Sequence, residues 1–316
     1  MHEKRPYPYA LLTATLLFLA SGAAQATISH TWVSSTGNDA NACTRSAPCA
    51  TFSGALSKTS AGGEIDVVDA GDYGSVTISQ AVSIEAVGVL ATIQVTSGNA
   101  ITISAGASDV VVLRGLTLDG QGTATDGIHF STGGSLYVED TRIHHFTTGI
   151  DFIPTTDSRL FVTDTIVRNN GTGSTGGGVF IQASGGQGFA TVSIDNLRTE
   201  SNVFGVKTID AANVTIRNSV AAKNGFAGFS AVQSGNTPRV LIESSITAHN
   251  GTGIVSADLS GGVSPFSPEV RLSNVTVVDN QTGLATSGLG VIISFGNNKV
   301  DNNGTNGSPT STISQI

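Results

Sequence analysis

The segment IRNSVAAKN, residues 216–224, carries a pattern that returns along the chain. It is repeated in IESSITAHN at residues 242–250 and in LSNVTVVDN at residues 272–280. Related segments begin at Leu113, Val138, Val162, Ile194 and Phe295, so that neighbouring starts lie 22 to 32 residues apart. Each begins with an apolar residue, and the ninth residue is Asn in six consecutive segments: Asn170, Asn202, Asn224, Asn250, Asn280 and Asn303. A period of this length is typical of a solenoid.

Short alternating apolar runs separated by Gly, Asn and Asp indicate strands that meet at tight turns. The third residue of most segments is Asn or Asp, which tolerate the left-handed backbone angles of such a corner. Because stacked coils lie about 4.8 Å apart, an inward amide can donate to one neighbour and accept from the other. We therefore predict two Asn corners in each coil. The competing interpretation, a loop-rich chain in which Asn and Gly recur through composition, does not explain six matches at one offset.

The pattern I-x-N-x-x-[apolar]-x-x-N-x-x-G-I resembles the right-handed parallel β-helix family, whose founding members are pectate lyases. The stretch from Trp32 to Tyr73, which contains WVS, GND, APCATF and GDY in that order, is similar to the N-terminal cap of many bacterial members. The resemblance implies an all-β fold, a right-handed parallel β-helix solenoid with a short N-terminal capping helix at about Thr51 to Lys58. It does not imply one activity, because the family includes lyases, hydrolases, epimerases, adhesins and binding proteins.

We expect four parts in the chain. Residues 1–26 have the features of a secretory signal peptide: Lys4 and Arg5, an apolar stretch over residues 9–20, and small residues at Ala24-Gln25-Ala26. Residues 27–76 would form the cap and first strand, residues 77–304 the coils, and residues 305–316 a polar tail. The apolar stretch is short for a stable membrane span. The expectation is a bacterial protein that is secreted or periplasmic, with an uncleaved anchor as the alternative.

Composition narrows the partners. The net charge is −8 and only 12% of residues are charged, so no basic stripe for nucleic acid is expected. Cys43 and Cys49 are the only cysteines, and we predict a disulfide between them in an oxidising compartment. No metal site and no cofactor are expected. Calcium is the alternative, and Asp66, Asp69 and Asp72 are the carboxylates that lie closest in sequence for it.

The first candidate site lies on the outward residues of the repeat, at offsets four and six from its first apolar residue. Offset six contains Asp119, His144, Arg168 and Glu200, and offset four contains Thr117, Arg142, Ile166 and Arg198. In one interpretation Asp119, His144 or Glu200 supplies an acid or base, and Arg142, Arg168 and Arg198 clamp a substrate. In the other, these residues are an alternating-charge ladder that stabilises an exposed face.

The second candidate site combines Asp126 and His129 with Asp151 on the next coil. The string Thr125-Asp126-Gly127-Ile128 resembles the first motif of polygalacturonases, N-T-D-G-I. The other motifs of that family, a paired Asp-Asp, a Gly-His-Gly and an Arg-Ile-Lys, are missing from this sequence. Inverting hydrolysis would require the second carboxylate about 6.5–9.5 Å from the first. The alternative interpretation is an ordinary turn that leads into a strand.

Aromatic residues are few, and they argue against a deep sugar groove. We assign Phe180, Phe204 and Phe229 to stacks in the core. The preferred function is therefore an exported, non-catalytic module that binds a polysaccharide, a cell-surface glycan or the envelope surface. The alternative is a polysaccharide lyase or a glycoside hydrolase that acts on an extracellular polysaccharide.

Overall fold

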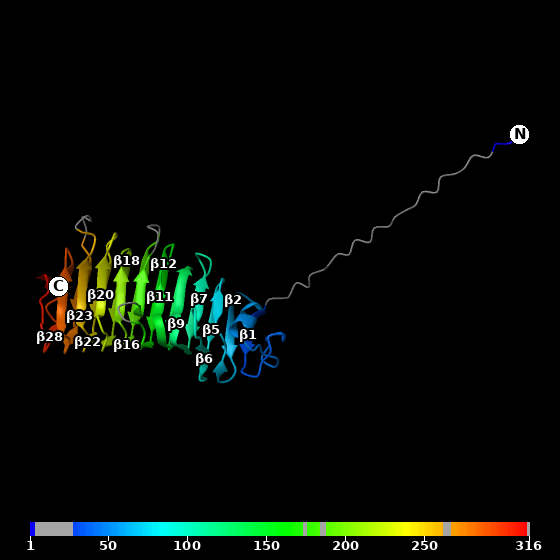
Figure 1. Cartoon of the computed structure of the whole chain (residues 1–316), viewed down its shortest axis with the longest axis horizontal. Helices are drawn as coiled ribbons and strands as arrows, with labels where there is room; N and C mark the ends of the chain where they lie inside the picture. The colour runs from blue at the N-terminus through cyan, green and yellow to red at the C-terminus, as the bar shows by residue number, and fades with distance from the viewer. Residues whose placement is uncertain (4–27, 173–175, 184–187, 262–266, 315–316) are drawn as a thin grey trace.

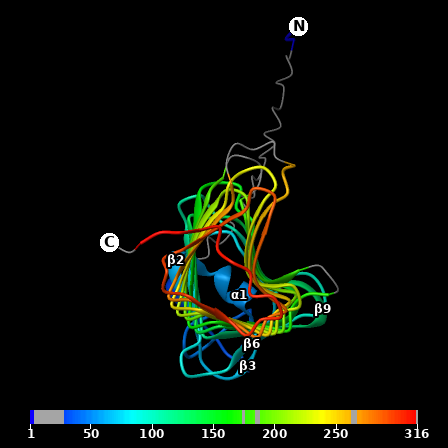
Figure 2. The same cartoon turned by 90° about the vertical axis from the view of Figure 1, so that its left-hand side faces the viewer.

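The computed structural model describes residues 1–3, 28–172, 176–183, 188–261 and 267–314. These residues form one helix and 29 strands, and the strands stack as successive coils of a rod (Figure 1). Viewed along the rod, the coils superimpose and enclose a common interior (Figure 2). The prediction of a parallel β-helix solenoid is confirmed, because every strand pair on the three faces described below is parallel.

The first face of the rod is a twelve-stranded sheet. In order, its strands are β1 (Ile28–Val33), β2 (Thr59–Val67), β5 (Val82–Glu85), β8 (Val110–Arg114), β10 (Ser135–Glu139), β12 (Ser158–Thr163), β15 (Ala190–Asp195), β18 (Ala212–Arg217), β21 (Arg239–Glu243), β24 (Glu269–Ser273), β27 (Val291–Ser294) and β29 (Ser311–Thr312). The predicted polar tail thus contributes β29 to this sheet, where Ser311 pairs with Ile293.

The second face consists of short strands. They are β3 (Gly71–Asp72), β6 (Ala91–Gln94), the first part of β9 (Leu116–Thr132), the first part of β11 (Arg142–Phe152), β13 (Ile166–Arg168), β16 (Arg198–Glu200), β19 (Val220–Ala222), β22 (Ile246–Ala248), β25 (Thr276–Val278) and β28 (Lys299–Asp301).

The third face follows the second across one corner of each coil. Its strands are β4 (Val76–Ile78), β7 (Ile101–Ser104), the second parts of β9 and β11, β14 (Gly177–Gln182), β17 (Phe204–Ile209), β20 (Ala227–Gln233), β23 (Thr252–Asp258) and β26 (Thr282–Ser287). In coils formed by β9 and β11, the strand continues around this corner without a break.

The corner between the second and third faces contains the Asn ladder that the sequence predicts. Asn224 Nδ2 donates to Asn250 Oδ1 at 2.9 Å, and the same bond joins each neighbouring pair at 2.9 to 3.2 Å, from Asn170 to Asn303. Each oxygen also accepts the backbone N–H of the preceding Asn. These side chains are buried down to Asn280, so the ladder satisfies polar groups that would otherwise each cost about 1–3 kcal/mol.

The third position of the repeat forms the other predicted corner. Asn196, Asn218 and Asn274 have φ values of 53°, 48° and 54°, which is the left-handed region that Asn tolerates better than most residues. Their side chains are exposed, in contrast to the buried ladder. The Asn residues at the third position therefore permit the turn, whereas the Asn residues at the ninth position fill the interior.

The first coils have no Asn at the ladder position. Phe146 occupies it and is buried, and its backbone N–H donates to Asn170 Oδ1 at 3.0 Å. Inside the same coils, the rings of Phe130 and Phe152 stack with centroids 4.5 Å apart. Aromatic packing therefore takes the place of the amide ladder in the part of the rod formed by β9 and β11.

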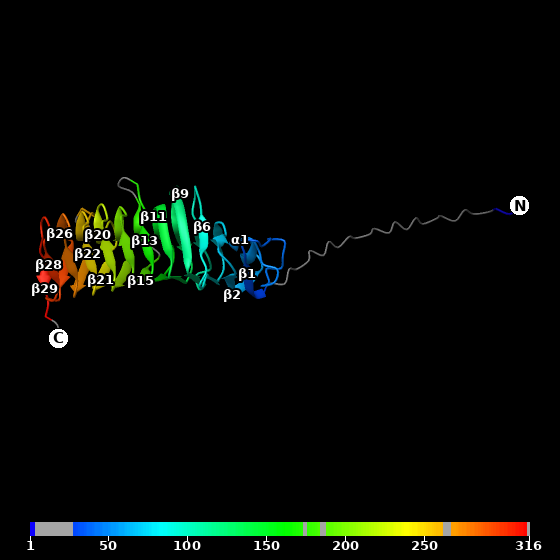
Figure 3. The ribbon, with the colours of Figure 1, turned by 90° about the horizontal axis from the view of Figure 1, so that it is seen from below.

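A short helix lies at the N-terminal end of the rod, beside β1 and β2 (Figure 3). Helix α1 (Phe52–Leu56) begins after Thr51, whose side chain accepts a hydrogen bond from the N–H of Gly54, and it buries Phe52 against the coil. The prediction of a capping helix is confirmed, although the helix is shorter than expected. The predicted disulfide between Cys43 and Cys49 is also present.

Most of the predicted signal segment, residues 4–26, lies outside the described residues. In the described part of the chain, no helix has the length and the hydropathy of a membrane-spanning segment.

Candidate functional site

One row of outward side chains runs along the third face, and we call it the His129 row. Strand register places its members next to one another on successive coils: Thr77, Thr102, His129, Asp151, Phe180 and Lys207. Five steps between coils correspond to about 24 Å at about 4.8 Å per step. The row therefore spans the length of several sugar units and contains hydroxyl, ionisable and aromatic groups in sequence.

Three ionisable side chains meet near the middle of this row, as the second candidate site predicts. His129 Nδ1 lies 2.8 Å from Asp151 Oδ2 and 3.2 Å from Asp126 Oδ2. The Asp126 side chain is 9% exposed, and those of Asp151 and His129 are 16% and 25% exposed. One imidazole thus faces two carboxylates in a partly closed environment.

Burial changes how these carboxylates ionise. It raises the pKa of Asp126 to about 6, and the neighbouring charge of Asp151 adds to the effect, while His129 and Thr148 oppose it. Burial also raises the pKa of Asp151, against the influence of His129. Carboxyl groups that exchange a proton near neutral pH are suited to acid or base chemistry.

The spacing of the two carboxylates limits that chemistry. One carboxylate oxygen each of Asp126 and Asp151 and one ring nitrogen of His129 all lie within 4.8 Å of one another. This is shorter than the separation of about 6.5–9.5 Å that leaves room for water in an inverting hydrolase. The pair therefore lacks the inverting geometry that the sequence alone left open for Asp151.

Lys207 and three phenylalanines form an outward ledge further along the row. The Nζ of Lys207 lies 4.5 Å from the ring centroid of Phe204 and 5.9 Å from that of Phe180. The ring of Phe204 also stacks with that of Phe226, which is 53% exposed. Burial lowers the pKa of Lys207, and this side chain forms no ion pair with any residue in the described ranges.

The assignment of these aromatic residues to the core was wrong for two of the three. Phe229 is fully buried, but Phe180 and Phe204 are only half-buried and belong to the ledge. The signal was present in the sequence. Phe180 follows Gly178-Val179 just as Asp151 follows Gly149-Ile150, and His129 follows Gly127-Ile128. That shared offset would have placed Phe180 in the same outward row as the ionisable residues.

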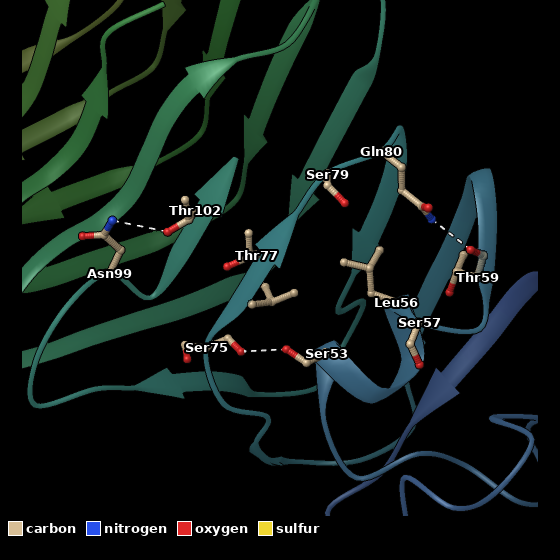
Figure 4. A pocket seen from close by; sticks show the side chains of 11 residues that line it. Ser53, Leu56, Ser57, Thr59, Ser75, Thr77, Ser79, Gln80, Asn99 and Thr102 are labelled. Atoms are coloured by element: carbon tan, nitrogen blue, oxygen red, sulfur yellow. Dashed lines mark hydrogen bonds between the residues drawn. The ribbon is translucent and has the colours of Figure 1, made fainter. Parts of the chain in front are cut away.

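A cavity of about 520 Å³ opens at the N-terminal end of the row (Figure 4). Thr77 and Thr102 belong both to the cavity and to the row. The other labelled side chains are mostly hydroxyl or amide groups and come from α1, β2 and the segments around β4: Ser53, Leu56, Ser57, Thr59, Ser75, Ser79, Gln80 and Asn99. The sequence did not suggest this cavity, which is within the volume range of ligand pockets.

The first candidate site lies on the second face, in the register that the sequence predicts. His144 is next to Asp119 and Arg168, and Arg168 is next to Glu200; at offset four Arg142 is next to Thr117 and Ile166, and Ile166 is next to Arg198. Arg198 pairs with Glu200 on its own strand at 2.5 Å, whereas Arg142 and Arg168 form no ion pair with any described residue. The predicted ladder of alternating charges is therefore incomplete.

Asp119 and two histidines form a compact group at the start of this face. His145 Nδ1 lies 3.0 Å and His144 Nδ1 lies 3.4 Å from Asp119 Oδ1. Burial lowers the pKa of His144, and the nearby charges of His145 and Arg168 act in the same direction, against Asp119. Although burial opposes it, the backbone N–H of Gln121 and the side chain of His145 lower the pKa of Asp119. The sequence pattern places Asp119 and His144 in this candidate site and does not include His145.

The three aspartates considered for calcium have separate partners. Asp66 bonds His30 at 2.7 Å, and Asp69 accepts hydrogen bonds from Ser34, Ser35 and Tyr73. The side chain of Asp72 accepts from the N–H groups of Gly74 and Gln94. Their contacts are those of side chains that hold the cap together.

Two solved structures and one family model are similar to this fold. A solved pectate lyase, Pel9A, superimposes with a TM-score of 0.64 at 18% identity, over 86% of this chain and 75% of that one. A rhamnogalacturonan lyase superimposes with a TM-score of 0.59 at 14% identity, over 80% and 74%. A search of curated protein sequences found no match. Residues 102–304, more than half of the chain, match the family described as the right-handed β-helix region. The chain therefore belongs to the right-handed parallel β-helix family.

Proposed function

We propose that this protein binds a polysaccharide chain along the His129 row. The observation that carries the proposal is the alignment of three features on one face: the hydroxyl-lined cavity, the Asp126–His129–Asp151 cluster, and the ledge of Lys207 and phenylalanines. Hydroxyl and amide groups can exchange hydrogen bonds with sugar hydroxyls, and exposed rings pack against the apolar faces of sugars. A row of about 24 Å accommodates an extended chain rather than a single sugar.

The wider setting supports an extracellular ligand. The disulfide between Cys43 and Cys49 fits an oxidising compartment. The signal features of residues 1–26 fit export to the periplasm or beyond. The two similar solved structures are named as lyases of pectate and of rhamnogalacturonan, both of which are polysaccharides.

Binding can be measured by affinity electrophoresis or a glycan array with the Phe180→Ala and Lys207→Ala variants. The expected result is a loss of affinity of about ten-fold for at least one polysaccharide, with an unchanged melting temperature. Phe161→Ala is the matched control, because Phe161 stacks with Tyr137 at 4.5 Å on the first face, away from the row. Equal losses in all three variants, or no binding by the unmodified protein, would refute the proposal.

A second candidate is cleavage of the same polysaccharide, which the ionisation of the row favours. Burial raises the pKa of Asp126 to about 6 and lowers the pKa of Lys207, so one face holds a carboxyl group and an amine whose pKa values are both shifted toward the neutral range. A panel of polysaccharides would be assayed for new reducing ends and for unsaturated products that absorb in the ultraviolet. Cleavage should disappear in Asp126→Asn and in Lys207→Ala while binding persists in Asp126→Asn. If binding occurs and nothing is cleaved, the non-catalytic function remains.

A further inference from the structure

The second face contains a triangle of potential ligand atoms that the polysaccharide proposal does not use. Asp119 Oδ1 is 3.0 Å from His145 Nδ1 and 3.4 Å from His144 Nδ1, and the two Nδ1 atoms are 3.0 Å apart. Two nitrogens and one oxygen thus converge on a small common space. The two imidazole rings are nearly perpendicular, with an interplanar angle of 84°. Both nitrogens therefore point into the space between the three side chains, and the rings do not stack.

No placement of protons on the two imidazoles gives every atom of this triangle a favourable hydrogen bond. If each imidazole carries its proton on Nδ1, two N–H groups point at each other across 3.0 Å while both compete for one oxygen. If only one ring carries the proton there, the other nitrogen can accept it across 3.0 Å, but the lone pair of that nitrogen then lies only 3.0 or 3.4 Å from the carboxylate oxygen. The arrangement differs from the Asp126–His129–Asp151 cluster, where a single nitrogen lies between two carboxylates and one proton can serve both.

The edges of the triangle match the spacing of ligands around a small metal ion. Zinc bonds nitrogen and carboxylate oxygen at about 2.0–2.1 Å, so ligands at right-angle to tetrahedral positions lie about 2.9 to 3.4 Å apart. The three distances of 3.0, 3.0 and 3.4 Å fall within that interval. We propose that Asp119, His144 and His145 bind a divalent transition-metal ion, with Zn²⁺ as the expected occupant.

The backbone holds these ligands in place. His145 has a φ of 64°, a left-handed conformation that the corner of the coil imposes and that turns its ring toward Asp119. Asp119 also accepts the N–H of Gln121 at 3.0 Å, which anchors the carboxylate. Asp119 and His144 are adjacent in strand register, so neither requires a change of the fold to bind the ion.

The donor set selects the class of metal. Two imidazoles and one carboxylate suit zinc and its transition-metal neighbours, whereas calcium takes six to eight oxygen ligands. Three protein ligands leave a fourth position open on an exposed face, where water or an anionic group can bind. The His30, Glu64 and Asp66 group is a weaker candidate, because His30 Nε2 is 4.0 Å from Glu64 and the side chains are well exposed.

The test is calorimetric titration of ZnCl₂ into protein purified without a polyhistidine tag. One equivalent of Zn²⁺ should bind, and Asp119→Asn, His144→Ala and His145→Ala should each weaken binding by at least about ten-fold. His249→Ala is the matched control, because His249 occupies the same corner of a later coil with a φ of 58° and has Ala248 beside it. His129→Ala controls for the other cluster. Both control variants should bind Zn²⁺ as the unmodified protein does.

Two further measurements separate this site from a folding effect. Co²⁺ in place of Zn²⁺ should give visible absorption bands that His145→Ala abolishes while its metal-free circular dichroism stays unchanged. Arg168→Ala should strengthen Zn²⁺ binding, because Arg168 brings a positive charge next to His144. Calcium should not compete. Absence of Zn²⁺ binding, or binding that disappears in His129→Ala and survives in His145→Ala, overturns the proposal.

Discussion

The coils built around β9 and β11 differ from the coils that follow them. In the later coils the corner between the second and third faces is filled by amides that are buried from Asn170 to Asn280 and partly buried at Asn303. In the earlier coils Phe146 takes the corner and the strand turns it without a break. The Asp119–His144–His145 and Asp126–His129–Asp151 clusters lie in the earlier coils. At the outward position of His144, the ladder coils have Arg168 and Glu200, followed by Ala222, Ala248, Val278 and Asp301.

The difference shows that the two histidine–aspartate clusters lie apart from the regular amide packing along the same rod. An amide ladder repeats the same bonds from coil to coil, so it stabilises without distinguishing one coil from the next. Where aromatic packing replaces it, the exterior carries half-buried carboxylates and imidazoles that cost stability unless they are paired. Groups kept at such a cost are candidates for function.

The largest effect is expected from a substitution that interrupts the Asn ladder in the later coils. Asn224 accepts hydrogen bonds from the backbone and side chain of Asn202, and it donates to Thr199 O and Asn250 Oδ1. Asn224→Ala should lower the free energy of unfolding in urea by about 3 kcal/mol, because it leaves buried groups unpaired. Asn213→Ala, at an exposed position of β18, should change it by less than about 0.5 kcal/mol. Similar losses from both substitutions would contradict the ladder.

The cap offers a test of the other end. Replacing Cys43 and Cys49 together by Ser should cost about 2 kcal/mol, because the disulfide restricts a short loop of the unfolded chain. In a solenoid each coil contacts mainly its neighbours. Amide hydrogen exchange should therefore accelerate in α1, β1 and β2 while the coils of the Asn ladder keep their protection. Uniform acceleration along the rod would show that the two regions unfold as one unit.

The next test concerns Asp126 in the earlier coils, whose charged form is disfavoured by burial. The pKa of Asp126 is raised from 3.8 to about 6, so the folded protein binds its proton more tightly than the unfolded chain does. The contribution of this group to stability therefore falls as pH rises from about 4 to about 6, and it stays low above that range.

Asp126→Asn should relieve this cost. The variant should be more stable than the unmodified protein by about 1–2 kcal/mol at pH 8 and equally stable at pH 3, because the substitution also loses the attraction between Asp126 and His129. Thermal unfolding across this pH range measures the difference. Asp157→Asn, at an exposed position, should show no pH-dependent change. A gain that is the same at every pH would contradict the ionisation argument.

The smallest expected effect concerns the charges of the second face. Arg198 and Glu200 pair at 2.5 Å, but the arginine side chain is 57% exposed. A double-mutant cycle with Arg198→Ala and Glu200→Gln should give a coupling of about 0.5 kcal/mol or less. A larger value would make this pair a structural element of the face, in agreement with the charge-ladder interpretation.

Sequence reasoning predicted the coil and the outward positions of the second face well. The alternation of strand residues is local, so the repeat placed Asp119, His144, Arg168 and Glu200 in one row, as strand register now shows. It also brought together Asp126, His129 and Asp151. The same alternation after each Gly-apolar pair was not followed to Phe180 and Lys207, and the ledge was missed for that reason.

Other features required the folded chain. The cavity combines side chains from α1, β2 and the coils around β4, which no single sequence period links. The contact of His145 with Asp119 depends on the left-handed conformation of His145 at the corner, which directs its side chain to the same point as that of His144. Such contacts depend on coil spacing and on side-chain rotamers, which sequence spacing does not specify.

By itself the sequence determined the coil period, the Asn ladder and the inward or outward direction of most repeat residues. The reason is that strand alternation and corner conformations depend on each residue and its near neighbours. The tertiary structure alone decided which outward groups meet, how deeply they are buried and how they ionise. Those properties arise between coils, where residues 22 to 32 positions apart come into contact and exclude water from one another.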